Sequence, residues 1–149
     1  MSVFKNDGLL VEQYNWEFSE DGGATGALAL DAKEDKPVTT LPAGALVMGV
    51  VGYVKTAVTS GGSLTAEWGD NSDPDGYSGS AIAVAALTVN SVFNGHDNGA
   101  ALLWDDTNDH AIYSYVDGST KDGSFDFTIN TAAATAGIME FRVLYLMVE

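Results

Sequence analysis

The stretch that decides the fold lies at the end of the chain and reads IMEFRVLYLMVE, residues Ile138 to Glu149. Glu140 and Arg142 stand between apolar residues, so that apolar and other side chains alternate. The alternating apolar set is Met139, Phe141, Val143, Tyr145 and Met147. Successive side chains of a β-strand point to opposite faces of a sheet, so a period of two gathers this set on one face. The stretch therefore predicts a long strand with one face in a hydrophobic core.

The same two-residue period recurs in other parts of the chain. The segments that share it are Tyr14 to Phe18, Leu64 to Gly69, His110 to Val116 and Ser124 to Asn130. Each is short and bounded by turn residues, as is usual for strands. Val38 to Leu41 is a further expected strand, at a sheet edge, because Pro42 ends it and cannot donate to a central ladder.

The longest apolar run is ALVMGVVGYVKTAV, residues Ala45 to Val58. An unbroken period of two puts Val47, Val51 and Tyr53 on one face. The opposite face then carries Met48, Val50 and Val54. Apolar residues on both faces are typical of a central strand that is covered twice. We expect the core to cover one face and a partner subunit to cover the other.

Turn residues separate these segments and set the fold class. Ser60 to Ser63 and Val116 to Ser124 are typical of hairpin loops, and Thr131 to Gly137 is an expected connector. Ser80 to Val89 mixes alanine with β-branched residues and predicts a short helix or an irregular crossover. Short strands between Gly, Asp and Asn turns predict an all-β fold. We expect one antiparallel β-sandwich or jelly-roll domain over residues 1–149, with at most a short helix.

Charge and composition exclude several classes of partner. Six Lys and Arg stand against 21 Asp and Glu, which gives a net charge of -15. Such a surface repels phosphate backbones and anionic lipid, so we expect neither nucleic acid nor a membrane as a partner. There is no cysteine, hence no disulfide or thiolate metal site.

The beginning of the chain, Met1 to Val11, shows no clear strand pattern and is an expected N-terminal arm. It has neither the basic nor the apolar region of a signal peptide, so we expect the protein to remain where it is made. The longest mostly apolar stretch, Ala43 to Val54, is too short and too rich in glycine to span a bilayer.

The densest cluster of acidic residues is WGDNSDPDGYSG, Trp68 to Gly79, and it suggests a calcium loop. An EF-type loop with Gly76 at its sixth position needs a bidentate glutamate at its twelfth, where Ile82 stands. A different calcium site that uses Asp70, Asp73 and Asp75 stays open. A turn is the favoured interpretation, because Asp-Gly and Pro are common turn residues.

Catalytic chemistry finds little support in the sequence. His96 and His110 could join carboxylates as zinc ligands, or one could act as a general base, but neither has a metal-ligand spacing. We expect both to be loop or strand-end residues. A hydrolase that uses Asp70, Asp105 or His110 remains a weak rival. No catalytic, cofactor-binding or metal-binding residue is assigned, and we expect no enzyme and no cofactor.

The three tryptophans raise the possibility of sugar binding through ring stacking. Trp16 and Trp68 are in phase with apolar neighbours, which is typical of core residues. Trp104 stands beside Asp105 and Asp106 and is the candidate for exposure. An alternative function is therefore a carbohydrate-binding domain, or a receptor-binding domain of the tail-fibre type.

Two parts of the chain together resemble a known family. They are TTLPAGALVMGVVGYVKTAVTSGGSLTAEWGDNSDPDGYSG, Thr39 to Gly79, and the closing strand FRVLYLMVE, Phe141 to Glu149. The first part joins a Leu-Pro-Ala-Gly turn, a long apolar strand, a Gly-Gly turn and a strand ending in Gly-Asp. An Asp-rich loop with Tyr77 follows. This order resembles the capsid decoration, or cement, proteins of tailed bacteriophages, which have a jelly-roll-like fold.

The resemblance implies a structural protein of the virion. Such a protein is made in the host cytoplasm and sits as a homotrimer on the outer capsid surface. It binds the phage major capsid protein and stabilises the contacts between its subunits. The family has no catalytic residues to carry over to this chain.

Overall fold

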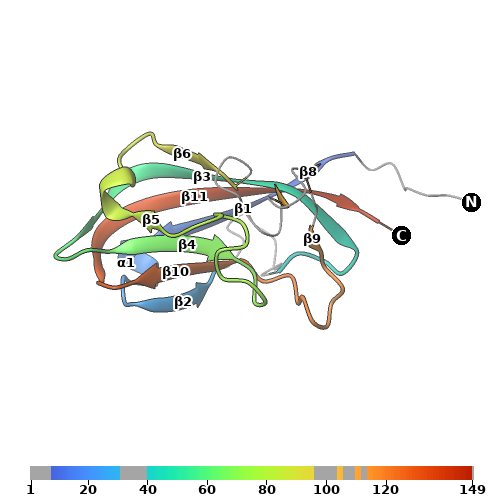
Figure 1. The fold of residues 1–149 in the computed structure, drawn as a ribbon, viewed down its shortest axis with the longest axis horizontal. Helices are drawn as coiled ribbons and strands as arrows, with labels where there is room; N and C mark the ends of the chain where they lie inside the picture. The colour runs from blue at the N-terminus through green and yellow to red at the C-terminus, as the bar shows by residue number, and fades with distance from the viewer. Residues whose placement is uncertain (1–7, 31–39, 96–103, 106–109, 112–113, 149) are drawn as a thin grey trace, which may run out of the picture.

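Two antiparallel β-sheets pack face to face in this protein (Figure 1). The computed structural model describes residues 8–30, 40–95, 104–105, 110–111 and 114–148 of the chain. The all-β sandwich expected from the sequence is confirmed. Within the described residues, no helix has the length and apolar character needed to cross a membrane.

The larger sheet, called sheet A, contains β1 (Leu10–Glu17), β3 (Ala45–Ser60), β6 (Val92–Asn94), β9 (Ser114–Tyr115) and β11 (Ala134–Met147). The smaller sheet, called sheet B, contains β2 (Gly26–Ala29), β4 (Thr65–Gly69), β5 (Ile82–Ala83) and β10 (Asp126–Asn130). A separate ladder joins β7 (Trp104–Asp105) and β8 (His110–Ala111). The helical elements are α1 (Phe18–Asp21) and the 3-10 turn η1 (Val84–Ala86).

The strand pairing follows the order of a jelly roll. Sheet A runs β1-β11-β3-β6 and sheet B runs β2-β10-β4-β5. The pairs β1·β11, β2·β10, β3·β6 and β4·β5 are all antiparallel. The first strand thus meets the last, and the pairing proceeds inward along the chain, as if one long hairpin were rolled into two sheets. The strands β7, β8 and β9 lie in the connection between β6 and β10.

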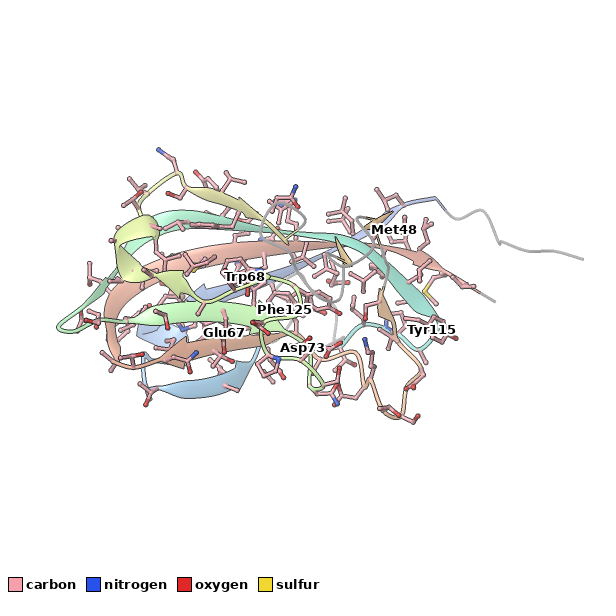
Figure 2. The ribbon with its side chains drawn as sticks, in the orientation of Figure 1. Met48, Glu67, Trp68, Asp73, Tyr115 and Phe125 are labelled. Atoms are coloured by element: carbon pink, nitrogen blue, oxygen red, sulfur yellow. The ribbon has the colours of Figure 1, made fainter. Side chains whose placement is uncertain are left out.

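Aromatic rings from both sheets fill the space between them. The ring of Phe141 in β11 has its centroid 5.1 Å from that of Trp68 and 5.0 Å from that of Phe125. It lies 5.5 Å from Phe127, which in turn lies 5.1 Å from Trp16 of β1. Figure 2 shows Trp68 and Phe125 between the two layers. The buried faces expected for β1, β4, β10 and β11 are confirmed.

A β-bulge interrupts the alternation of side chains in β3. Gly49 pairs with Leu144 and Val47 pairs with Tyr145, so Met48 is an additional residue on the β3 side. One additional residue moves every later side chain to the other face. The expected assignment of faces is therefore wrong. The buried side chains are Val47, Val50 and Val54. The half-buried side chains on the opposite face are Met48, Val51 and Tyr53. The expected central position of β3, between β11 and β6, is confirmed.

The two segments expected to be hairpin loops do not join neighbouring strands of one sheet. Each connects a strand of sheet A to a strand of sheet B. Ser60 to Ser63 connects β3 of sheet A to β4 of sheet B, and Val116 to Ser124 connects β9 to β10 in the same way. Glycine-rich turns reverse the chain in either case, and packing in the core decides which strand becomes the neighbour. The expected connector Thr131 to Gly137 is also partly wrong, because β11 already begins at Ala134.

The remaining predictions shift at their boundaries. The first strand begins earlier than expected, at Leu10, so that the last two residues of the expected arm pair with β11. Residues 1–7 lie outside the described part of the chain, as do Val38 and Thr39 of the expected edge strand; Thr40 and Leu41 are not in a strand.

Two further segments, Ser80 to Val89 and His110 to Val116, have the general structure expected from the sequence. The irregular crossover expected at Ser80 to Val89 is confirmed, since it holds only the two residues of β5 and the turn η1. The strand expected at His110 to Val116 corresponds to β8 and β9, with residues 112–113 outside the described part. Phe18 starts α1 rather than ending the first strand.

Gly52 in β3 leaves room for Trp68. A Cβ atom at Gly52 would lie 2.9 Å from the Trp68 ring, whereas one at Gly49 would meet nothing within 4 Å. We expect Gly52→Ala to lower the free energy of unfolding by about 1–3 kcal/mol, because the added methyl group overpacks the core. Urea denaturation followed by tryptophan fluorescence measures this change.

Gly49→Ala, in the same strand, is the matched control and should change the free energy of unfolding by less than about 1 kcal/mol. Equal losses in the two variants would show that the close approach of Trp68 is not the cause.

Candidate interaction surface

The Asp-rich loop after β4 is closed by its own hydrogen bonds. Oδ1 of buried Asp70 accepts from the backbone N–H of Ser72 at 2.8 Å and from its hydroxyl at 2.6 Å. The same oxygen accepts from the N–H of Asp73 at 3.1 Å. A Cβ atom at Gly69 would collide with the carbonyl oxygen of Asp73, so the turn also requires glycine there. The aspartate that begins the loop thus shapes a turn.

A second loop, between β9 and β10, is bonded to this turn. The side-chain amide of Asn71 donates to the carbonyl of Thr120 at 3.0 Å. The ammonium of Lys121 donates to the hydroxyl of Ser114 at 2.8 Å and lies 3.7 Å from Oδ2 of Asp70. The two loops therefore form one hydrogen-bonded unit, which we call the paired loops (residues 70–79 and 117–124).

Tyr77, the aromatic residue of the sequence resemblance, is a core residue of the paired loops. Its ring stacks on Phe125 at a centroid distance of 6.1 Å, and its side chain is buried. Burial raises the pKa of the Tyr77 hydroxyl far above its ordinary value. The ring anchors the loop to the core and leaves the polar residues 71–75 at the loop tip.

The three aspartates considered for a calcium site are not arranged as metal ligands. Within the described ranges, no group of three or more histidine or acidic side chains is placed to hold a metal ion. Burial raises the pKa of Asp73, and a hydrogen bond and charge repulsion from Asp75 raise it further.

The other residues considered from sequence fall into three groups: buried residues, residues of a short ladder and residues outside the described part of the chain. Trp16 and Trp68 are buried, as expected for core residues, and the indole of Trp16 donates to the carbonyl of Gly22 at 3.0 Å. Trp104, Asp105 and His110 lie in the ladder of β7 and β8, and nothing is described of their side chains. His96 and Asp106 lie outside the described residues.

Exposed apolar side chains gather on the outer face of sheet A, which points away from sheet B. The β-ladders place Val11 opposite Leu144 and Tyr53 opposite Val92. Val11, Val92 and Tyr115 are 51%, 61% and 48% exposed. Grouped apolar side chains on a surface mark sites of interaction. The apolar side chains of this face are Val11, Leu46, Met48, Val51, Tyr53, Val92, Tyr115, Leu144 and Leu146.

An ion cluster lies in the middle of the outer face. The guanidinium of Arg142 bonds to Oε1 of Glu140 at 2.6 Å and 2.9 Å, and the ammonium of Lys55 lies 3.2 Å from Oε2. Burial alone would raise the pKa of Glu140, but the hydrogen bonds from Arg142 and Lys55 outweigh it and hold the pKa below its ordinary value. The carboxylate is therefore neutralised by two cations.

A small cavity of about 120 Å³ lies at the edge of the sandwich, beside α1 and β2. Trp16, Phe127 and Ile129 form its apolar side, and the chain from Gly22 to Leu28 forms the rest. Its size and lining suit an apolar side chain. Asp21 is the one acidic residue in this lining.

The sequence contains a partial signal for the outer face. Leu144 and Leu146 are apolar at positions where the exposed side of the closing strand should be polar. Val11 and Val92 become neighbours of this face only through the pairing of β1 with β11 and of β3 with β6. No local sequence motif indicates which strands far apart in the chain will pair.

One comparison with known proteins found a likeness of fold. A chain of the cyanophage Pam1 capsid asymmetric unit is similar to this protein with a TM-score of 0.54 and 18% identity. The likeness covers 94% of this chain and 85% of that chain, so the two are of comparable length. No protein-family model and no curated protein matches the sequence. The likeness shows a shared sandwich fold.

Two aspartates of the paired loops should contribute to the stability of the fold with opposite dependence on pH. The pKa of Asp73 is raised, whereas backbone N–H groups of Ser119 and Lys121 lower the pKa of Asp117. An acid with a raised pKa stabilises the fold below the pKa of the unfolded chain, about 3.9, and this contribution is lost as the pH rises through the folded-state pKa. We therefore expect Asp73→Asn to raise the melting temperature at pH 7 and to have little effect at pH 3.

Asp117→Asn is the matched contrast for this prediction. The stabilisation from a lowered pKa is present above the pKa of the unfolded chain and is lost in acid. This variant should lower the melting temperature at pH 7 and not at pH 3. Thermal unfolding by circular dichroism at both pH values measures the two effects, and the same sign at pH 7 for both variants would contradict the assignment.

Proposed function

We propose that this protein is a structural component of a bacteriophage virion. It binds the outer surface of the capsid and stabilises contacts between subunits of the major capsid protein. The observation that carries the proposal is the likeness of fold, over 94% of the chain, to a chain of a phage capsid asymmetric unit. The sequence pattern at Thr39 to Gly79 and Phe141 to Glu149 supports the same assignment independently.

The charge of the chain supports a position on the outside of the capsid. A net charge of -15 repels packaged DNA, so the protein gains nothing from a position inside the shell. An outer subunit meets only protein and solvent.

The mechanism in this proposal is mechanical. A homotrimer that touches neighbouring capsid subunits adds buried area across their seams, and a standard interface buries roughly 1,600 Å². Several weak contacts made by one oligomer act together through a high effective concentration. The paired loops suit such contacts, since their hydrogen bonds hold Asn71 and Thr120 in place before binding.

The rival sugar-binding function has less support. It requires exposed aromatic rings near the acidic loops. Trp16, Trp68 and Tyr77 are buried, whereas Tyr115 is exposed and the side chain of Trp104 lies outside the described part of the structure. A catalytic function is not part of the proposal. It would need a cluster of reactive side chains, and the described carboxylates of the paired loops are used in turns and ion pairs.

Attachment to phage heads tests the proposed function directly. We expect the purified protein to cosediment with expanded heads that lack it, to saturate at a fixed ratio and to form symmetric density outside the shell in electron microscopy. Decorated heads should also remain intact at higher temperature than bare heads, because each subunit adds contact area across a seam. Unexpanded heads and a glycan array serve as controls. Glycan binding without head binding would favour the rival function.

The first seven residues supply a second test, because β1 pairs with β11 only from Leu10 onward. We propose that Met1 to Asp7 act as an arm that becomes ordered on the capsid. Deleting them should leave the melting temperature within about 2 °C, since the strands of both sheets lie outside this segment, and should weaken attachment by about tenfold. Cosedimentation with expanded heads measures the loss, and unchanged attachment would refute the arm.

A further inference from the structure

We infer that the outer face of sheet A is the surface through which copies of this chain bind one another. The occupant is a second copy of the same chain. The inference rests on the proposed function only for the expectation of a homo-oligomer. The face itself follows from the charges, exposure and pairing of described residues.

Net charge restricts where two copies can meet. Each copy carries a charge of -15, so most approaches bring like charges together. Sheet A places Arg142 and Lys55 on either side of Glu140, and both oxygens of that carboxylate are paired. The charges of this cluster sum to +1, from two cations and one carboxylate, so it attracts acidic side chains of a second copy instead of repelling them.

The opposite outer face, on sheet B, has a different charge pattern. Its strands contain Glu67 and Asp126 and no lysine or arginine. Both acidic residues alternate with buried neighbours such as Trp68 and Phe127, so they lie on the side away from the core. Two copies that met through sheet B would bring these carboxylates together.

Apolar side chains flank the ion cluster on both sides. Toward one end of sheet A lie Leu144 and Val11, which pair across β11 and β1. Toward β6 lie Tyr53 and Val92, which pair directly. A surface with apolar groups around a few satisfied polar groups has the composition of a protein interface.

The cations of the ion cluster can also reach a second copy. The side chains of Arg142 and Lys55 are 55% and 50% exposed, whereas that of Glu140 is 11% exposed. A guanidinium has five N–H donors, and two nitrogens of Arg142 bond to Glu140. Because the Arg142 side chain is half exposed, its remaining donors are accessible to carboxylate acceptors on the acidic surface of a second copy. The same chain thus supplies both halves of the contact.

Charge insertion at the two ends of the face tests the inference. Val92→Glu and Val11→Glu each add one negative charge at an exposed position, where folding tolerates it. We expect the wild-type chain to form an oligomer in sedimentation velocity and light scattering over a dilution series. Each variant should dissociate at a concentration about tenfold higher or more, because an unpaired charge is forced into the contact.

Ala83→Glu is the matched control, since Ala83 is an exposed residue on the outer side of sheet B and receives the same charge. It should keep the wild-type mass at every concentration. Circular dichroism and melting temperatures of all three variants verify that they fold.

Several results would overturn the inference. A wild-type chain that is monomeric throughout the series excludes the contact, as do variants of the face that retain the wild-type mass. Equal dissociation of Ala83→Glu would show a general effect of charge. If the Val11 and Val92 variants lost head binding but kept the wild-type oligomeric mass, the face would be the site that binds the capsid protein instead. An oligomer that depends on this face but binds no heads would leave the inference intact and refute the proposed function.

Discussion

The packing of aromatic rings around Phe141 is the interaction on which the rest of the structure depends. Its ring contacts Trp68 and Phe125 from the opposite layer, and its strand pairs with β1 on one side and β3 on the other. A residue in this position fixes the distance and the register between the sheets together. Gly52 and Gly137 have no side chain because Trp68 and Trp16 occupy the space where a Cβ would stand. The packing of this core therefore determines the positions of the outer face and of the paired loops.

The buried faces could be predicted wherever the period of two was unbroken. Met139, Phe141 and Val143 are buried as their spacing requires. The faces of β3 could not be predicted, because the bulge at Met48 depends on the strand opposite. The sheet crossing at Ser60 to Ser63 escaped prediction for a related reason. A local turn motif does not say which distant strand will pair with the next one.

The acidic loop shows a similar limit to the prediction of binding sites from sequence. Its composition permits a cation site and a turn, and the sequence favoured the turn on residue preferences alone. Three hydrogen bonds to Oδ1 of Asp70 explain why the turn forms, because they tie residues 72 and 73 back to the start of the loop. The outer face had a weaker signal in Leu144 and Leu146. Its extent became evident only when strand pairing brought Val11 and Val92 to the same side.

Charge links the fold to assembly. A chain of net charge -15 dissolves readily and avoids nucleic acid, but the same charge opposes contact between copies. The fold separates these effects by placing Lys55 and Arg142 around Glu140 within sheet A. Exposed pairs of this kind add little stability to a single chain. Their value therefore lies in making one face nearly neutral, so that apolar contacts such as those of Val92 can outweigh the repulsion between two copies.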